Sequence, residues 1–336
     1  MASTSRAWYF AERPEGEPDM DCFDLKEREV PGPDAGQLLV EVRYLSVDPY
    51  MRGRMRDRES YAEPWDVGDV LKGVVVGEVV ESEHDRYGTG DLVTGEGAWA
   101  EHALLNGHEV APVDPRVADP PAYLGALGMP GRTAYFGLLD VGDPNPGDTV
   151  VVSGAAGAVG SVVGQIASLN GCHVVGFAGS DEKTDWLTDD LGFDAAINYK
   201  STDDYRAALD EAAPDGVDVY FDNVGGPITD AVFTKLNLDA SVAVCGQIAH
   251  YNDEEVPMGP RKLPMLIPSR ASVEGFLVSD FSGRFRQASE QLGEWVARGE
   301  IQHRETVVDG LDRAPDAFLG LFSGDNIGKQ VVRVSE

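Results

Sequence analysis

The feature that most constrains the fold is a glycine-rich turn between an apolar strand and an apolar helix. Residues 150–167 read VVVSGAAGAVGSVVGQIA, with glycines at 154, 157 and 160. Glycines in such a turn permit a sharp change of direction, close approach of the backbone to a pyrophosphate, and tight packing of helix on sheet. The pattern predicts a nucleotide site, although tight packing alone also explains glycines.

Strand-like and helix-like segments alternate through the middle of the chain. We expect strands at residues 149–152, 172–178, 194–199, 217–224, 241–248 and 272–278, and helices at 159–169, 181–190, 201–213, 227–236 and 283–298. This alternation predicts a doubly wound parallel sheet with helices on both faces. The pair Asn170 and Gly171 is expected to end the first helix with a left-handed cap.

The two ends of the chain have a different pattern. Short β-like runs at 37–45, 70–80 and 91–94 are separated by glycine and proline clusters, which predicts a mostly antiparallel β domain. Short strands at 305–308 and 329–334 are expected to return to it. The expected α/β organisation is therefore 1–122 for the first part of this domain, 123–300 for the nucleotide-binding domain, and 301–336 for the return.

The charge excludes several classes of partner. The chain has 58 acidic and 27 basic residues and a net charge of −31 at pH 7, with the acids spread along its length. Such a surface repels nucleic acid and anionic membranes. Because self-repulsion of this size needs screening, we expect a protein of a high-salt cytoplasm; an acidic protein of an ordinary cytoplasm is the alternative.

Targeting and metal-binding patterns are missing from the sequence. No window reaches the ~20 apolar residues of a membrane helix, and the first ten residues lack the apolar run of a secretory signal, so a cytoplasmic location is expected. Cys22, Cys172 and Cys245 lie far apart and form no CxxC pair. The six histidines have no HExxH spacing, so no metal site is expected.

The end of the second expected strand favours NADP over NAD. An NAD site usually has an acid there to bind the ribose hydroxyls. Here residues 177–180 read FAGS, and Lys183 follows in the first turn of the next helix, where it can pair with a 2′-phosphate. The alternative is a solvated lysine beside Asp181 and Glu182.

Eight stretches, in order over nearly the whole chain, resemble one family. They are VDPYMRGRM at 47–55, LGMPGRTAYFG at 127–137, GAVGSVVGQ at 157–165, GFDAAINYK at 192–200, YFDNVGG at 220–226, CGQI at 245–248, VEGF at 273–276 and NIGK at 326–329. On these residues the chain resembles the zinc-independent medium-chain dehydrogenases/reductases, in the branch of prostaglandin reductases, plant alkenal double-bond reductases and bacterial curcumin reductase. Zinc-binding members carry a catalytic cysteine where this chain has Ser46.

The resemblance implies a two-domain fold and a set of NADP(H) contacts. The fold is a Rossmann domain plus a GroES-like, mostly antiparallel β catalytic domain built from both chain ends, often as a homodimer through the Rossmann edge strands. The implied cofactor-binding residues are Gly157, Ala158, Val159, Gly160, Lys183, Tyr199, Asn223, Cys245, Gly246, Tyr251, Phe276, Leu277, Val278 and Asn326. Without the resemblance, Tyr199 reads as a strand-end aromatic and Asn223 as a loop cap.

The resemblance also implies NADPH-dependent reduction of the carbon–carbon double bond of α,β-unsaturated ketones and aldehydes. Hydride addition to the β-carbon leaves negative charge on the carbonyl oxygen, where a phenol with an ordinary pKa of ~10 can donate a hydrogen bond. The family places this tyrosine at Tyr251 and a second, substrate-side tyrosine at Tyr50. Either could instead only line a wall. His250 departs from the expected small or polar residue and either perturbs Tyr251 or faces solvent.

Two other functions remain open at this point. A quinone is also a conjugated enone, so an NADPH:quinone reductase on the same scaffold is the first alternative. The second is a non-catalytic NADP-binding protein, against which the glycine turn, Lys183 and both tyrosines argue.

Overall fold

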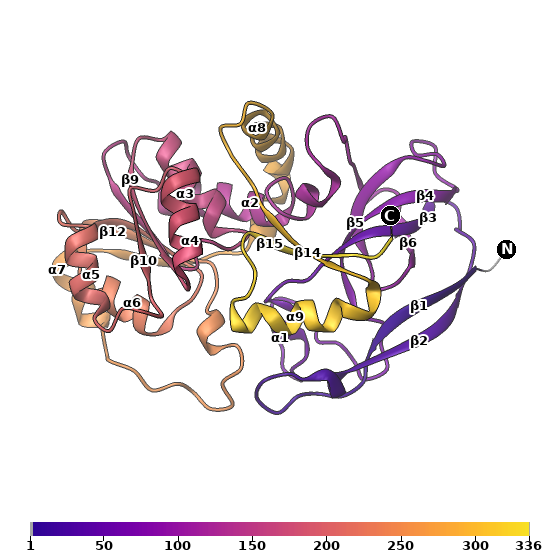
Figure 1. Ribbon diagram of the computed structural model, residues 1–336, viewed down its shortest axis with the longest axis horizontal. Helices are drawn as coiled ribbons and strands as arrows, with labels where there is room; N and C mark the ends of the chain where they lie inside the picture. The colour runs from indigo at the N-terminus through magenta and orange to yellow at the C-terminus, as the bar shows by residue number, and fades with distance from the viewer. Residues whose placement is uncertain (1–2, 336) are drawn as a thin grey trace. The chain divides into compact units, whose positions relative to one another are not determined.

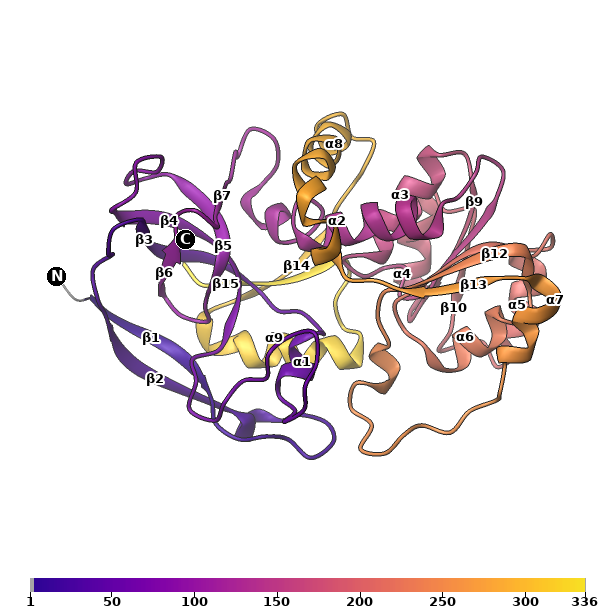
Figure 2. The same ribbon diagram turned by 180° about the vertical axis from the view of Figure 1, so that it is seen from behind.

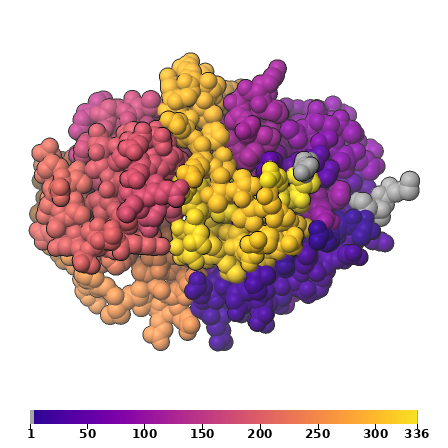
Figure 3. Space-filling model, viewed as in Figure 1, coloured from indigo at the N-terminus to yellow at the C-terminus, as the bar shows by residue number. Residues whose placement is uncertain are grey.

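The computed structural model describes residues 3–335, which divide into two units. The first, called the β unit, comprises residues 3–124, Asn252–Glu254 and 305–335. The second, called the Rossmann unit, comprises Gly125–Tyr251 and Glu255–Arg304. Both ends of the chain therefore belong to one unit. The space-filling view shows C-terminal residues (yellow) beside N-terminal residues (indigo) on its surface (Figure 3).

The β unit contains a two-stranded and a seven-stranded sheet (Figure 1). Strands β1 and β2 pair antiparallel, and the larger sheet has the order β14-β15-β3-β4-β5-β7, with β6 on β3. The elements are β1 (Ser3–Phe10), β2 (Phe23–Val30), β3 (Gln37–Ser46), α1 (Met51–Arg54), β4 (Lys72–Ser82), β5 (Leu92–Ala98), β6 (His102–Asn106), β7 (Ala111–Pro112), β14 (Glu305–Asp309), α9 (Ala314–Ser323) and β15 (Lys329–Arg333). Among the described strands of this unit, β14 and β15 alone pair parallel, which confirms the mostly antiparallel prediction.

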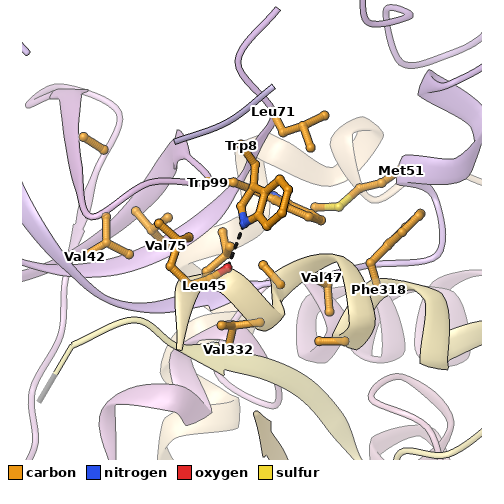
Figure 4. Close-up of a cluster of buried hydrophobic side chains, with 14 of the residues drawn as sticks. Trp8, Val42, Leu45, Val47, Met51, Leu71, Val75, Trp99, Phe318 and Val332 are labelled. Atoms are coloured by element: carbon orange, nitrogen blue, oxygen red, sulfur yellow. Dashed lines mark hydrogen bonds between the residues drawn. The ribbon is translucent and has the colours of Figure 1, made fainter. Parts of the chain in front are cut away.

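Aromatic side chains from both chain ends fill the core of the β unit. Trp8, Trp99 and Phe318 are at least nine-tenths buried and pack in one cluster (Figure 4). The indole Nε1 of Trp8 donates to the carbonyl of Leu311 at 2.7 Å, so the first strand is joined to the C-terminal segment by both packing and a buried hydrogen bond.

A buried ion pair lies at the end of β3. Lys329 and Asp48 are 3% and 6% exposed, and the Lys329 ammonium donates to Asp48 Oδ1 at 3.0 Å and to the carbonyl of Val47 at 2.7 Å. The Ser46 hydroxyl donates to the other carboxylate oxygen. The Met51 N–H donates to the carbonyl of Asp48 at 3.1 Å. Together these contacts on Asp48 fix the turn that contains Tyr50.

The Rossmann unit is a six-stranded parallel sheet in the order β10-β9-β8-β11-β12-β13. Its elements are α2 (Met129–Phe136), β8 (Thr149–Val152), α3 (Gly160–Leu169), β9 (His173–Ala178), α4 (Asp181–Asp185), β10 (Ala195–Asn198), α5 (Tyr205–Ala212), β11 (Val217–Asp222), α6 (Gly226–Val232), β12 (Leu236–Val244), α7 (Leu266–Ser269), β13 (Ser272–Gly275) and α8 (Phe285–Ala297). Helices α2, α3 and α8 lie on one face and α5 and α6 on the other (Figure 2). The doubly wound prediction is confirmed, and the order in which successive strands join the sheet reverses between β8 and β11, although all the strands stay parallel.

Several elements differ from the sequence expectations. The helix expected at 181–190 is α-helical only to Asp185 and continues as a π-helical turn, Trp186–Asp190. Strand β12 begins five residues before the expected 241, and helix α9 was not expected. Gly171 has φ +78°, which confirms the left-handed end of α3. Within residues 3–335, no helix has the length and apolarity needed to cross a membrane.

Candidate active site

The three glycines of the turn have different structural constraints. Gly154 has φ +59°, and a Cβ on Gly160 would lie 2.4 Å from the carbonyl oxygen of Gly154, so both positions need glycine for the turn itself. A Cβ on Gly157 would approach only that same oxygen, at 3.2 Å. Ala158 and Val159 are half-buried, and Gly160 begins α3. Backbone N–H groups at this helix start fit the pyrophosphate of a dinucleotide.

The second cofactor region lies at the ends of β9 and β10. The N-cap Ser180 accepts a hydrogen bond from the Lys183 N–H at 3.3 Å, which places Lys183 in the first turn of α4. A Cβ on Gly179 would lie 2.7 Å from the Tyr199 hydroxyl, so this tyrosine covers the end of β9. Burial raises the pKa of Tyr199, which keeps its hydroxyl protonated.

The acids beside Lys183 have partners of their own. Asp181 Oδ1 accepts from the Asn198 amide at 2.7 Å, and Glu182 pairs with Arg304 at 3.2 Å. The 2′-phosphate contact and the solvated lysine beside these two acids both stay predictions.

Asn223 follows β11, at the point between β8 and β11 where the strand order of the sheet reverses. Its side-chain amide donates to the Ser153 carbonyl at 2.8 Å, and its N–H donates to the Ser153 hydroxyl at 2.9 Å. Ser153 follows β8 directly, just before the glycine turn, so Asn223 is held against that turn. Crevices at such reversals, outside the carboxyl ends of the strands, are where dinucleotides bind.

The loop after β12 brings three predicted residues to the same edge. Cys245 and Gly246 both donate their N–H groups to the carbonyl of Asp222, at 2.8 and 3.0 Å. A Cβ on Gly246 would lie 3.2 Å from both the Asn223 carbonyl and the Tyr251 hydroxyl. The structure therefore brings Asn223, Gly246 and Tyr251 together.

Tyr251 is half-buried, and its phenol oxygen accepts a hydrogen bond from the Gln247 N–H at 3.5 Å. Burial raises its pKa above the ordinary value near 10, so the phenol stays protonated at neutral pH. Burial, followed by the Asp222 carboxylate, raises the pKa of the Cys245 thiol to about 12. Cys245 is therefore a neutral thiol and no nucleophile at neutral pH.

The remaining predicted residues differ in setting. The ring of Phe276 packs on Phe221 at a centroid distance of 6.1 Å and on Gly137, so a cofactor contact there falls to backbone atoms, as it can at Leu277 and Val278. Asn326 and Tyr50 belong to the β unit. The Asn326 amide donates to the Gly328 carbonyl at 2.8 Å, and burial raises the pKa of Tyr50.

Sequence reasoning missed the polar residues that hold this edge together, Ser153, Asp222 and Gln247. Asp222 is 1% exposed and Ser153 fully buried. Each ends or follows a strand, and polar residues at the carboxyl ends of adjacent parallel strands were the available signal. No group of three or more His, Cys, Asp or Glu side chains arranged to hold a metal ion occurs within residues 3–335.

The fold and this edge of the sheet define a dinucleotide-binding unit joined to an antiparallel β unit, and comparison with known proteins identifies the family. Residues 6–113 match a family described as the N-terminal domain of oxidoreductase, and residues 158–294 match one described as zinc-binding dehydrogenase. NADPH-dependent curcumin reductase of Escherichia coli is 44% identical over 98% of this chain and 97% of its own. The NADP-dependent 2-alkenal reductase of Nicotiana tabacum is 45% identical over 90% of this chain and 88% of its own.

A solved structure agrees with these relatives. The crystal structure of CurA from Vibrio vulnificus in complex with NADPH superposes with a TM-score of 0.93, at 41% identity over 98% of this chain and 99% of that one. The chain belongs to the medium-chain dehydrogenase/reductase family of NADP-dependent oxidoreductases, in the branch that includes curcumin, 2-alkenal and prostaglandin reductases.

Proposed function

We propose that this enzyme reduces the carbon–carbon double bond of α,β-unsaturated ketones and aldehydes with NADPH. The observation that carries the proposal is a protonated phenol, Tyr251, held beside Asn223 and Gly246 at the edge of the sheet that contains the glycine turn. The identity with reductases named for curcumin and 2-alkenals supports this substrate class.

Bound NADPH would supply the hydride, and the protein's own residues have two tasks. The glycine turn and Lys183 would bind and orient the phosphates. Asn223 and Tyr199 would line the cofactor site beside the phosphates. Tyr251 would donate its hydrogen bond to the substrate carbonyl oxygen as negative charge develops there. Tyr50 as a second substrate-side residue and Asn326 as a cofactor contact stay predictions carried by the family.

A substrate panel tests the proposed function. With NADPH, an alkenal or an enone should be consumed and yield the saturated carbonyl compound, whereas a saturated aldehyde should leave the absorbance at 340 nm unchanged. Faster turnover of a simple quinone than of any enal or enone would select the quinone reductase. Tight NADPH binding without turnover of any compound would select the non-catalytic alternative.

Lys183→Ala should reduce the preference for NADPH over NADH. Losing a charge-assisted contact to the 2′-phosphate is expected to raise the Kd for NADPH about 10- to 100-fold and to leave that for NADH unchanged. Lys235→Ala, which removes a lysine paired with Asp210, is the matched control and should change neither Kd. Fluorescence titration measures both values, and an unchanged preference in the Lys183 variant would favour the solvated lysine.

The enzyme is proposed to work without zinc. Where zinc-binding members carry a cysteine this chain has Ser46, which hydrogen-bonds to Asp48, and Asp48 is already paired with the Lys329 ammonium. A cation at this carboxylate disfavours a second, metallic one. Full activity after exhaustive chelation supports the proposal, and activity that requires stoichiometric zinc contradicts it.

Two properties of the assembly and its environment are also proposed. All four residues of the edge strand β13 are exposed, and an unpaired edge can add a strand from a second copy, so the homodimer is proposed to form there. A monomer in sedimentation would contradict it.

The net charge of −31 supports adaptation to high salt. Thermal stability that does not rise with KCl concentration would contradict this proposal. The cytoplasmic location stays a prediction.

A further inference from the structure

Asp222 is a buried carboxylate surrounded by six donors. Its Oδ1 accepts from the Ser153 and Tyr220 hydroxyls, each at 2.9 Å, and from the Val224 and Gly225 N–H groups at 3.0 and 2.9 Å. Its Oδ2 accepts from the Thr229 hydroxyl and the Gln247 amide, each at 2.8 Å. Because donors occupy both oxygens, the orientation of this side chain is fixed.

This carboxylate joins three segments at the reversal point of the sheet. Ser153 follows β8 before the glycine turn, Val224 and Gly225 lead into α6, and Gln247 belongs to the loop after β12. Because one rigid group accepts from all three, the position of each segment depends on the others.

Gln247 connects Asp222 to the loop that contains Tyr251. Its amide donates both to Asp222 and, at 3.0 Å, to the carbonyl of Gly246. A Cβ on Gly225 would lie 2.2 Å from Gln247 Oε1, so the side chain also packs closely on the backbone of Gly225. The backbone N–H of Gln247 donates to the Tyr251 hydroxyl at 3.5 Å.

We propose that Asp222 and Gln247 are positioning residues for Tyr251. The Asp222 carboxylate holds the Gln247 side chain, and the Gln247 backbone thereby holds the phenol oxygen beside Gly246. The inference rests on the proposed role of Tyr251 as hydrogen-bond donor. It assigns to this pair the orientation of that donor, and a misplacement of about 1 Å at such a group is expected to cost on the order of 10²-fold in rate.

Gln247→Leu removes the hydrogen bond between Gln247 and Asp222 and leaves the other five donors to Asp222 in place. Asp222→Asn would replace the oxygen that accepts from Thr229 and Gln247 with an amide donor and so disturb several contacts at once, whereas leucine keeps about the bulk of glutamine and removes only its hydrogen bonds. We expect kcat to fall about 10- to 100-fold, a larger factor than that by which the Kd for NADPH rises. Hydrogen exchange over residues 245–251 should accelerate by about tenfold or more.

Asn237→Leu is the matched control. Its amide donates to the Asp218 carboxylate at 2.8 Å, the same pair of groups at the same distance, but near the amino ends of β12 and β11. It should leave kcat and exchange over 245–251 unchanged. In a double-variant cycle, Gln247→Leu should lower kcat no further once Tyr251 is phenylalanine, because both act through the phenol.

Two results would overturn the inference. One is a Gln247→Leu variant whose kcat and loop exchange equal those of the parent. The other is a rate loss that adds fully to that of Tyr251→Phe. If the parent enzyme reduces no conjugated carbonyl compound, the proposed function fails. The comparison of hydrogen exchange between the two leucine variants still tests whether Asp222 and Gln247 hold the loop at residues 245–251.

Discussion

Tyr251→Phe should lower kcat for an enone by up to about 10²–10³-fold, the usual loss for one oxyanion donor. Phenylalanine keeps the ring that packs in the loop and removes only the hydroxyl beside Gly246. Since the loss falls on charge that develops during the reaction, the Kd for NADPH should change little and kcat/KM should fall with kcat. Steady-state kinetics with a titration of the cofactor measures both.

The matched control is Tyr135→Phe, which removes a hydroxyl elsewhere in the Rossmann unit, from a tyrosine packed on Phe136 and Trp295. Its kcat should equal that of the parent. A Tyr251→Phe variant with the parent rate would remove Tyr251 from the chemistry and leave it as a wall of the site.

Lys329→Met should destabilise the β unit by about 3–5 kcal/mol, because it leaves the buried Asp48 carboxylate without its cation. The same change removes the donor to the Val47 carbonyl, so the turn before Tyr50 should loosen as well. Urea unfolding, monitored by near-ultraviolet circular dichroism, measures the free energy of unfolding.

Lys235→Met provides the comparison for the ion pair. Lys235 pairs with an Asp210 side chain that is 52% exposed, so its loss should cost less than about 1 kcal/mol. Adding Asp48→Asn to Lys329→Met should recover most of the lost stability, because the uncompensated charge is then gone. Equal costs for the two lysine variants would mean that the buried pair contributes no more than a surface one.

The fold followed from local sequence patterns. Apolar strands alternating with helices, the turn at Gly154 and the cap at Gly171 are all set within a few residues, so the parallel sheet of the Rossmann unit was predictable. Helix α5 starts later than expected, at the N-cap Asp204, and the unexpected helix α9 has Pro315 in its first turn and ends at Gly324 with φ +70°, so local signals for both were present in the sequence and were overlooked.

The site was predictable only in part. Lys183 and the glycine turn stand at fixed offsets from a strand, and Tyr251 and Asn223 came from family resemblance. The pairings that hold them span long stretches of sequence: Ser153 with Asp222, Asp222 with Gln247, and Asp48 with Lys329. Such partners meet only in the folded chain, so no local pattern indicates them.

The most direct test of the proposed reaction is the fate of deuterium from NADPH labelled at the transferring C4 position. With an enone as substrate, we expect one deuterium on the β-carbon of a saturated ketone, located by NMR, with the carbonyl intact. Deuterium on the carbonyl carbon of an unsaturated alcohol, or no transfer to the enone at all, would contradict it.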